Sequence, residues 1–597
     1  MDNQRNLLLA VVLSGLLILG WDLGMRYFYP QPDVPVSSEQ STAASTSPAQ
    51  ADGAAPAAGS GDIGEGAALA EAQTGPLDLE TALASENRVV IDAPRIAGTI
   101  NLVGARIDDL VLKDYNDTTA DDSGLVRIFA PDRTDIQHFA EFGFVVGGER
   151  MSSQAVWQAD SQRLTPETPV TLSRTDENGL TFNVRLSIDE NFMLTAEQSV
   201  ENGSDSAAII QPFALIKRTS TNASPDQFIA HAGPTGVFGG SLYDPNSYAE
   251  LAELGRDAPA GEASWLGFTD NYWASALIPG EGETDSAGWR SLGDDLFRAD
   301  LIYNAATVPA GGSLSETTQL FAGAKESVVL DQYEATGITL FGKTISWGWF
   351  EWFEKPLLWL LRNLNDLVGN FGVAIILLTV IIRGLLFPIA QKQFASMAQM
   401  KAVQPKMKAI QERYKDDKQT QQQKIMELYK EEKVNPLAGC LPLLIQIPIF
   451  FALYKVLYLA IEMRHEPFLY MSDLSAPDPA KILNLFGLLP YDVPGFLGIG
   501  ILAILLGVTM WLTFKLNPSA MDPVQQQIFN LMPWFLMFVM APFAAGLLLY
   551  WVTSNILTLA QQSYLYSKHP QLKAAAEKEK AEMAKKKARE EAEKSGA

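Results

Sequence analysis

The segment that decides the fold is IILLTVIIRGLLFP, from Ile375 to Pro388. It is apolar enough to lie in lipid, yet Arg383 stands near its middle. Arginine stays protonated at any physiological pH, and it costs roughly 2.5–3.5 kcal/mol at the centre of a membrane helix. Either this charge reaches the membrane surface, or the fold requires it where it is.

Outward from this segment, the chain divides into two parts of different charge. Residues 31–350 carry 46 acidic and 17 basic side chains, a net of −29, whereas the rest carries 23 acidic and 28 basic, a net of +5. The acidic part indicates a soluble domain without affinity for DNA or anionic lipid. The rest is typical of a membrane protein with basic loops. The single cysteine excludes an intramolecular disulfide.

The N-terminal segments predict an anchor and a tether. Residues 7–20 are almost wholly apolar, and the bulky WDLGMRYFYP that follows offers no small-residue cleavage site. We expect an uncleaved transmembrane anchor over residues 1–29. Residues 30–80 are rich in Ala, Ser, Gly and Pro and cannot form a core, so a disordered linker is expected there.

Residues 81–345 predict an all-β domain. Short alternating runs such as LTFNVRLSI and FMLTAEQSVEN are separated by Gly, Asn and Asp turns, a spacing typical of an antiparallel sandwich. The two histidines, His138 and His231, are interpreted as ordinary positions of the fold. No metal-ligand spacing, nucleophile motif or phosphate loop is present, so neither a metal nor a cofactor is expected.

Residues 346–566 predict a membrane domain of five helices, which makes six with the anchor. The apolar spans lie near 358–387, 437–461, 496–516, 526–541 and 544–566. Basic residues set the orientation: segment 391–436 holds ten Lys/Arg, and the tail 567–597 holds nine. Both fall on one side of a six-span protein. We therefore expect the N- and C-termini in the cytoplasm and residues 30–350 outside.

Two interpretations of Arg383 remain open. Thr379 lies one turn earlier on the same helix, and no acidic residue lies within the cores of the five spans. A wet concavity between helices would keep the charge hydrated. Its wall would include some of the other polar residues of the spans: Gln446, Lys455, Thr509, Thr553, Ser554, Asn555 and Gln561. Alternatively, Arg383 snorkels, since Lys392 is about 13 Å further along the helix and half the hydrocarbon thickness is roughly 15 Å.

Segment 391–436 reads as two amphipathic helices joined at KDDK, residues 415–418. Its methionines offer adaptable apolar contacts suited to a variable, greasy partner; they are Met397, Met400, Met407 and Met426. The alternative is a solvated loop that packs on itself. The basic tail 567–597 could bind ribosomal RNA or anionic lipid, or could simply be solvated.

Four stretches resemble the YidC family of membrane protein insertases. They are GVAIILLTVIIRGLLFPIAQKQFASMAQMKAVQPKMKAI, VNPLAGCLPLLIQIPIFFALYKVL, GLLLYWVTSNILTLAQQ and, in the β domain, LGFTDNYWASALIP. The resemblance implies a bacterial inner-membrane insertase and chaperone, not an enzyme. Implied partners are nascent membrane proteins, lipid, the Sec translocon and, through the tail, the ribosome. It also implies a periplasmic β-supersandwich of the sugar-mutarotase type.

The resemblance also assigns roles to residues. It implies a hydrophilic groove, open to the cytoplasm and to lipid, whose charge is Arg383, with Thr379 one turn before it. The groove's aromatic position in the last span matches Trp551. From the polar residues of the spans noted above, rather than from the resemblance, Gln446 and Asn555 are expected on the wall. The hairpin 391–436 would capture substrate. Residues 462–495 are longer and more apolar than the family pattern leads us to expect.

Two further functions are considered. A small-solute transporter would need paired ionisable groups through the spans, and the lack of acidic residues in the span cores argues against it. A sugar-binding sensor with a passive anchor would leave six spans and the hairpin unexplained.

Overall fold

The structure, a computed structural model, describes residues 77–568 except 86, 121, 222–231, 244–246, 416, 433–440, 487, 490–492, 494–497 and 517–522. The anchor expected over 1–29, most of the linker over 30–80, His231 and nearly all of the tail over 567–597 lie outside the described residues. The side chains of residues 393–402 within a long helix also lie outside the description.

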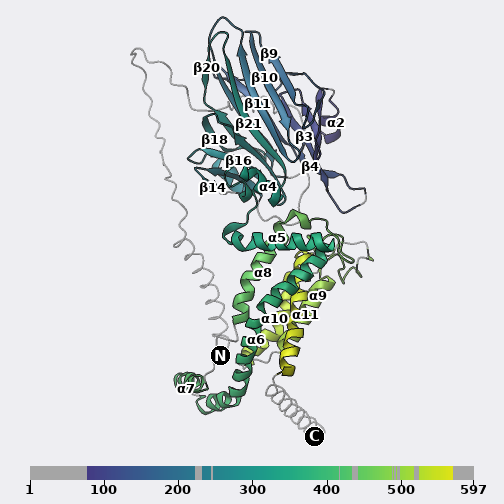
Figure 1. The fold of residues 1–597 in the computed structure, drawn as a ribbon, viewed down its shortest axis with the longest axis vertical. Coiled ribbons are helices and arrows are strands. Elements are labelled where there is room, and N and C mark those ends of the chain that lie inside the picture. Colours follow the sequence, from purple (N-terminus) through teal and green to yellow (C-terminus); the bar gives the residue numbers. More distant parts are fainter. Residues whose placement is uncertain are drawn as a thin grey trace. The chain divides into compact units, whose positions relative to one another are not determined.

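The N-terminal part of the described chain is a β domain of two sheets, drawn in purple to teal in Figure 1. Among the described residues, the larger sheet runs in the order β15 (Arg256–Asp257), β18 (Thr284–Gly293), β19 (Leu296–Tyr303), β12 (Ala208–Thr219), β5 (His138–Val146), β3 (Arg106–Asn116), β2 (Ile96–Asn101), β1 (Arg88–Asp92) and β8 (Arg163–Leu164). Three strands pair off this path: β20 (Ala306–Val308), β4 (Leu125–Phe129) and β6 (Glu149–Arg150). The described pairings of this sheet are antiparallel except that of β1 with β8.

The second sheet runs in the order β14 (Ser241–Tyr243), β13 (Gly233–Phe238), β16 (Ala263–Thr269), β17 (Trp273–Pro279), β21 (Ser313–Ala324), β11 (Met193–Asn202), β10 (Leu180–Ile188), β9 (Val170–Thr175) and β7 (Gln158–Ala159). Alternation explains how it packs: every second residue of β10 from Leu180 to Ile188 is buried, while those between are partly or fully exposed. Side chains of period two cover a core on one face only. Trp265, Trp273 and Trp289 lie fully within the domain's core.

Short helices complete the domain and its exit. They are α2 (Leu79–Leu83), α3 (Tyr248–Leu254), α4 (Ser327–Ala335), and the 3₁₀ turns η3 (Phe341–Thr344) and η4 (Gly348–Phe350). The bundle follows with α5 (Glu351–Val368), α6 (Phe371–Arg413), α7 (Lys418–Glu431), α8 (Leu441–Leu459), η6 (Ile461–Met463), α9 (Ile501–Leu516), α10 (Pro523–Met540) and α11 (Ala545–Lys568).

The span expected over 358–387 is wrong as a single helix. Helix α5 ends before Gly369, whose φ of 69° is left-handed, a conformation that glycine adopts without steric cost. Asn370 then caps α6, because its side chain accepts a hydrogen bond from the backbone N–H of Val373 at 3.1 Å. In Figure 1, α5 runs crosswise to α6, α8 and α11. Its exposed Trp352 and Trp359 lie opposite a buried leucine face.

Within the described residues, one helix is long and apolar enough to cross a membrane, Phe371–Lys392 of α6. Shorter apolar helical segments occupy Gln446–Leu459, Ile501–Lys515 and Asn530–Met540. Helix α11 packs between α6 and α9, and α10 packs on α9. A tight turn over residues 541–544, which includes Pro542, joins α10 to α11. The bundle therefore brings α6, α8 and α11 together around the position of Arg383.

Candidate functional site

The side chain of Arg383 lies against helix α11. Its Nε donates a hydrogen bond to the hydroxyl of Ser554 at 3.0 Å, and its Nη2 donates to the same oxygen. Ser554 is almost fully buried. Further along α11, the side-chain amide of Gln561 donates to the backbone carbonyl of Arg383 at 3.3 Å. Helices α6 and α11 are thus joined at the arginine by polar contacts as well as by packing.

The polar contacts extend to a third helix through Tyr550. This residue precedes Ser554 by four positions on α11, so both side chains lie on one helix face. Its buried hydroxyl accepts a hydrogen bond from Nε2 of Gln446 on α8 at 2.9 Å. We call Arg383, Gln446, Tyr550 and Ser554 the polar cluster; α6, α8 and α11 each contribute to it.

The charge of Arg383 is not balanced by a described carboxylate. No ion pair among the described residues includes it, and its side chain donates hydrogen bonds to one neutral hydroxyl, that of Ser554. Arg383 is also only partly buried. A guanidinium has five N–H donors, so one serine oxygen cannot replace its hydration. This arrangement favours water at the polar cluster.

The structure brings only some of the predicted site residues together. Arg383 and Gln446 belong to the polar cluster, whereas Asn555 lies on another face of α11 and donates to the hydroxyl of Thr509 at 3.2 Å. Thr379 is fully buried, and its hydroxyl donates to the carbonyl of Ile375 in its own helix at 2.6 Å. Trp551 packs on Phe450 of α8, with ring centroids 4.7 Å apart.

Sequence reasoning missed Tyr550 and counted Ser554 only among the polar residues of the spans. A signal existed: Tyr550 and Ser554 are four residues apart and share a face, while Trp551 and Asn555 share the next face around. The sequence does not reveal which of these two faces is turned toward Arg383. That depends on how α11 is rotated against α6.

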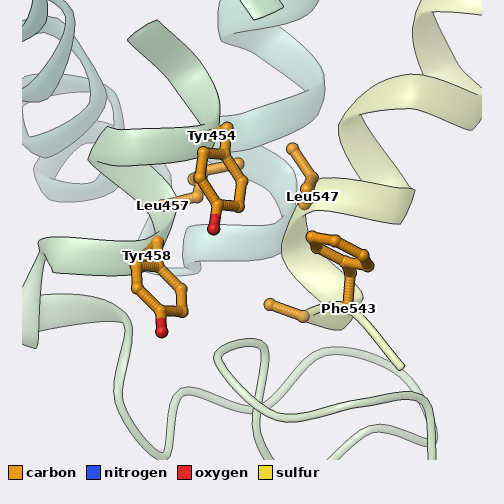
Figure 2. Close-up of a pocket in the computed structure, with 6 residues that line it drawn as sticks. Tyr454, Leu457, Tyr458, Phe543 and Leu547 are labelled. Carbon is orange, nitrogen blue, oxygen red and sulfur yellow. The ribbon is translucent and has the colours of Figure 1, made fainter. Parts of the chain in front are cut away.

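An apolar hollow lies elsewhere between α8 and the start of α11 (Figure 2). Figure 2 shows the rings of Tyr454, Tyr458 and Phe543 around it, with Leu457 and Leu547. The two tyrosine rings are stacked, with centroids 5.5 Å apart. No member of the polar cluster lines this hollow, so we do not place the site there.

The hairpin methionines differ in exposure. Met407 is buried between α6 and α7 with Val403 and Leu428, and the Tyr429 hydroxyl lies 3.2 Å from its sulfur. Its expected role on a capture surface is therefore corrected: in this structure it holds the two helices together. Met426 is 55% exposed. The side chains of Met397 and Met400 lie outside the described residues.

In the β domain, the buried charges have partners. The guanidinium of Arg218 donates to both carboxylate oxygens of Asp270, at 2.9 and 3.2 Å. Asp270 belongs to the LGFTDNYWASALIP stretch, so this motif serves at least partly to build the fold. His138 is buried with its Nε2 2.9 Å from the hydroxyl of Ser275. Burial and the nearby charge of Arg218 hold the pKa of His138 well below its usual value.

The chain joins a β domain to a bundle of apolar helices, and an arginine of the bundle donates a hydrogen bond to a serine hydroxyl. These features define a class of protein, a membrane protein with a large β domain. Comparison with known proteins identifies the family within this class. The family model for the 60Kd inner membrane protein matches residues 363–573, and that for the YidC periplasmic domain matches residues 88–360. The chain therefore belongs to the YidC family of membrane protein insertases.

Relatives match along nearly the whole chain. The membrane protein insertase YidC of Rhizobium johnstonii is 40% identical over 592 residues, covering 95% of this chain and 96% of the relative. That of Rhizobium etli is 41% identical over 585 residues, covering 95% and 96%. A solved structure of an active YidC insertase covers 82% of this chain and 94% of its own, with 19% identity and a TM-score of 0.35.

Proposed function

We propose that this insertase moves short polar segments of nascent membrane proteins across the bilayer through a hydrated groove built around the polar cluster. The observation that carries the proposal is the hydrogen bonding of Arg383 to a neutral hydroxyl, with no described carboxylate beside it. A cation left without an anion at membrane depth attracts acidic residues of a passing segment, most strongly where the dielectric constant is low.

The proposed topology has six spans with both termini in the cytoplasm and the β domain in the periplasm. A groove open on the cytoplasmic side shortens the distance that a polar segment travels through hydrocarbon. Apolar helices of the substrate leave into lipid, driven by the hydrophobic effect. Membrane potential and partitioning suffice as driving forces for this path. We also propose that the protein inserts some substrates together with the Sec translocon, and that its basic tail contacts ribosomes.

Site-specific crosslinking tests the groove. A photoreactive residue at position 383 or 551 should crosslink to a stalled nascent chain. The matched control is Leu385, which is 75% exposed on α6 and, two residues from Arg383, lies on the opposite side of the helix. Crosslinking at 385 as strong as at 383 would contradict a path past the polar cluster.

Charge replacement tests the role of Arg383. Arg383→Ala should impair insertion of substrates with acidic outer tails, because the attraction is lost, while Arg383→Lys should retain most of it. Substrates with neutral tails should be affected little by either change. Normal insertion of acidic-tailed substrates by Arg383→Ala would indicate that the arginine only snorkels.

The hairpin of α6 and α7 is proposed to capture substrate through its exposed apolar side chains. Met426→Asp should weaken insertion without changing the thermal stability of the hairpin, because that side chain is exposed. Met407→Asp serves as the comparison, since it places a charge between the helices and should unfold the hairpin. Unchanged insertion by Met426→Asp would remove this methionine from the capture surface.

A further inference from the structure

Between α8 and α9 the chain exposes a cluster of large apolar side chains. Six of the residues in 482–489 are between 39% and 80% exposed, namely Ile482, Leu483, Leu485, Phe486, Leu488 and Leu489. We call these six residues the apolar loop. Charged residues do not occur between positions 482 and 489. In water, a contiguous apolar surface of this kind indicates an interaction site.

The apolar loop is held in place by its flanks. The buried carboxylate of Asp478 accepts hydrogen bonds from the backbone N–H of Leu502, at 2.8 Å, and of Ala480, at 2.9 Å. Leu502 is in the first turn of α9, so Asp478 satisfies a donor that the helix leaves free. A Cβ at Gly500 would lie 2.5 Å from Cγ of Asp478. The close approach therefore requires glycine.

The tip of the loop is also ordered by backbone contacts. The N–H of Phe486 donates to the carbonyl of Lys481 at 2.8 Å, and that of Ile482 donates to Ile499 at 3.0 Å. Leu485 and Phe486 have left-handed φ angles of 50° and 62°. Bulky residues are uncommon there. The turn thus keeps these side chains exposed despite an unfavourable backbone.

The length of α9 indicates what covers the loop. At 1.5 Å per residue, the 16 residues of α9 span about 24 Å, whereas the hydrocarbon core is about 30 Å thick. At its C-terminal end the ammonium of Lys515 lies 4.6 Å from the ring centroid of Trp511; tryptophan is enriched at the membrane interface, and lysine at the ends of membrane spans. The apolar length that α9 lacks relative to the hydrocarbon core is therefore missing at its N-terminal end, where the apolar loop is attached.

We propose that the apolar loop inserts into lipid, in the leaflet at the N-terminal end of α9, and completes the apolar length of that helix. The exposed Leu505 and Leu512, seven residues apart on one face of α9, continue the same apolar surface along the helix. The apolar loop has no charged residue, so contact with acyl chains is favourable. If the loop supplies the missing apolar length, the bilayer does not have to thin to about 24 Å to match α9. The inference does not depend on the proposed groove.

A polarity-sensitive fluorophore tests the proposal in the full-length protein. Cys440, the single native cysteine, is replaced by serine, and Phe486→Cys or Leu488→Cys is labelled in phosphatidylcholine–phosphatidylglycerol vesicles. Leu505→Cys is the lipid-facing control. Leu254→Cys on α3, 59% exposed in the β domain, is the aqueous control.

We expect blue-shifted emission at 486 and 488 relative to 254, together with quenching by spin labels placed high on the lipid acyl chains. Emission that matches position 254 and is quenched by aqueous iodide would overturn the proposal. So would blue-shifted emission insensitive to lipid spin labels, because another polypeptide, such as a second copy or a client, would then cover the loop.

Discussion

Arginine has different partners in the β domain and in the helical bundle. In the β domain, Arg218 is 1% exposed and faces both oxygens of Asp270. In the bundle, Arg383 faces the hydroxyl of Ser554. Placing a charge inside a protein costs free energy unless an anion pairs with it or water molecules still hydrate it. Arg218 therefore contributes to the stability of its domain. Arg383 has no carboxylate partner among the described residues, and this difference is the basis of its proposed attraction for acidic substrate segments.

The largest effect should come from breaking the β-domain pair. Arg218→Ala leaves the Asp270 carboxylate buried without its partner, and removal of one member of such a pair costs roughly 3–5 kcal/mol. Hydrogen exchange of peptides from β12 and β5 in the full chain measures the loss. Arg185→Ala is the control, because its pair with Glu197 is 3.7 Å long and largely exposed, and should cost less than about 1 kcal/mol.

Acid should weaken the β domain through His138. Its pKa in the folded domain lies well below 6.5 because of burial and Arg218, so below pH 6.5 the unfolded chain takes up a proton that the folded domain does not. Stability is therefore highest above pH 6.5 and falls as pH decreases, by at most about 1.4 kcal/mol at pH 5.5 for this one group. Exchange rates of β5 at pH 7.5 and 5.5 report this change. In His138→Gln the decrease should shrink by that amount; an undiminished decrease would assign it to other groups.

The smallest effect is expected where water can replace a protein partner. Ser554→Ala removes the hydroxyl that Arg383 contacts, and in a dry site the loss of a hydrogen bond to a charge would cost about 1.5–3 kcal/mol. With water present we expect less than about 1 kcal/mol. The measurement is hydrogen exchange of α6 and α11 in vesicles. Thr558→Ala is the control, because its hydroxyl bonds only within α11, to the carbonyl of Ser554 at 2.7 Å.

Sequence patterns predicted the family, the β-rich domain and an apolar helix around Arg383, since these rest on local alternation, apolar runs and motifs. The break between α5 and α6 was not predicted. Gly369 and Asn370 are typical helix-capping residues and indicate this break, but the apolar residues on both sides of them were taken as one continuous span. The partners of Arg383 and Arg218 could not be found in this way. Ser554 is 171 residues from Arg383, and Asp270 is 52 from Arg218. Such pairings depend on helix rotation and strand order.

Accessibility of position 383 to water tests the central claim most directly. In a Cys440→Ser background, Arg383→Cys replaces the long side chain by one too short to reach the membrane surface, so its reactivity reports the environment at that depth. A charged, membrane-impermeant thiol reagent is added to the cytoplasmic face of inverted vesicles. Leu385→Cys, 75% exposed on the opposite side of the same helix, is the lipid-facing control. A hydrated groove predicts rapid modification at 383 and slow modification at 385; equally slow modification at both positions would contradict it.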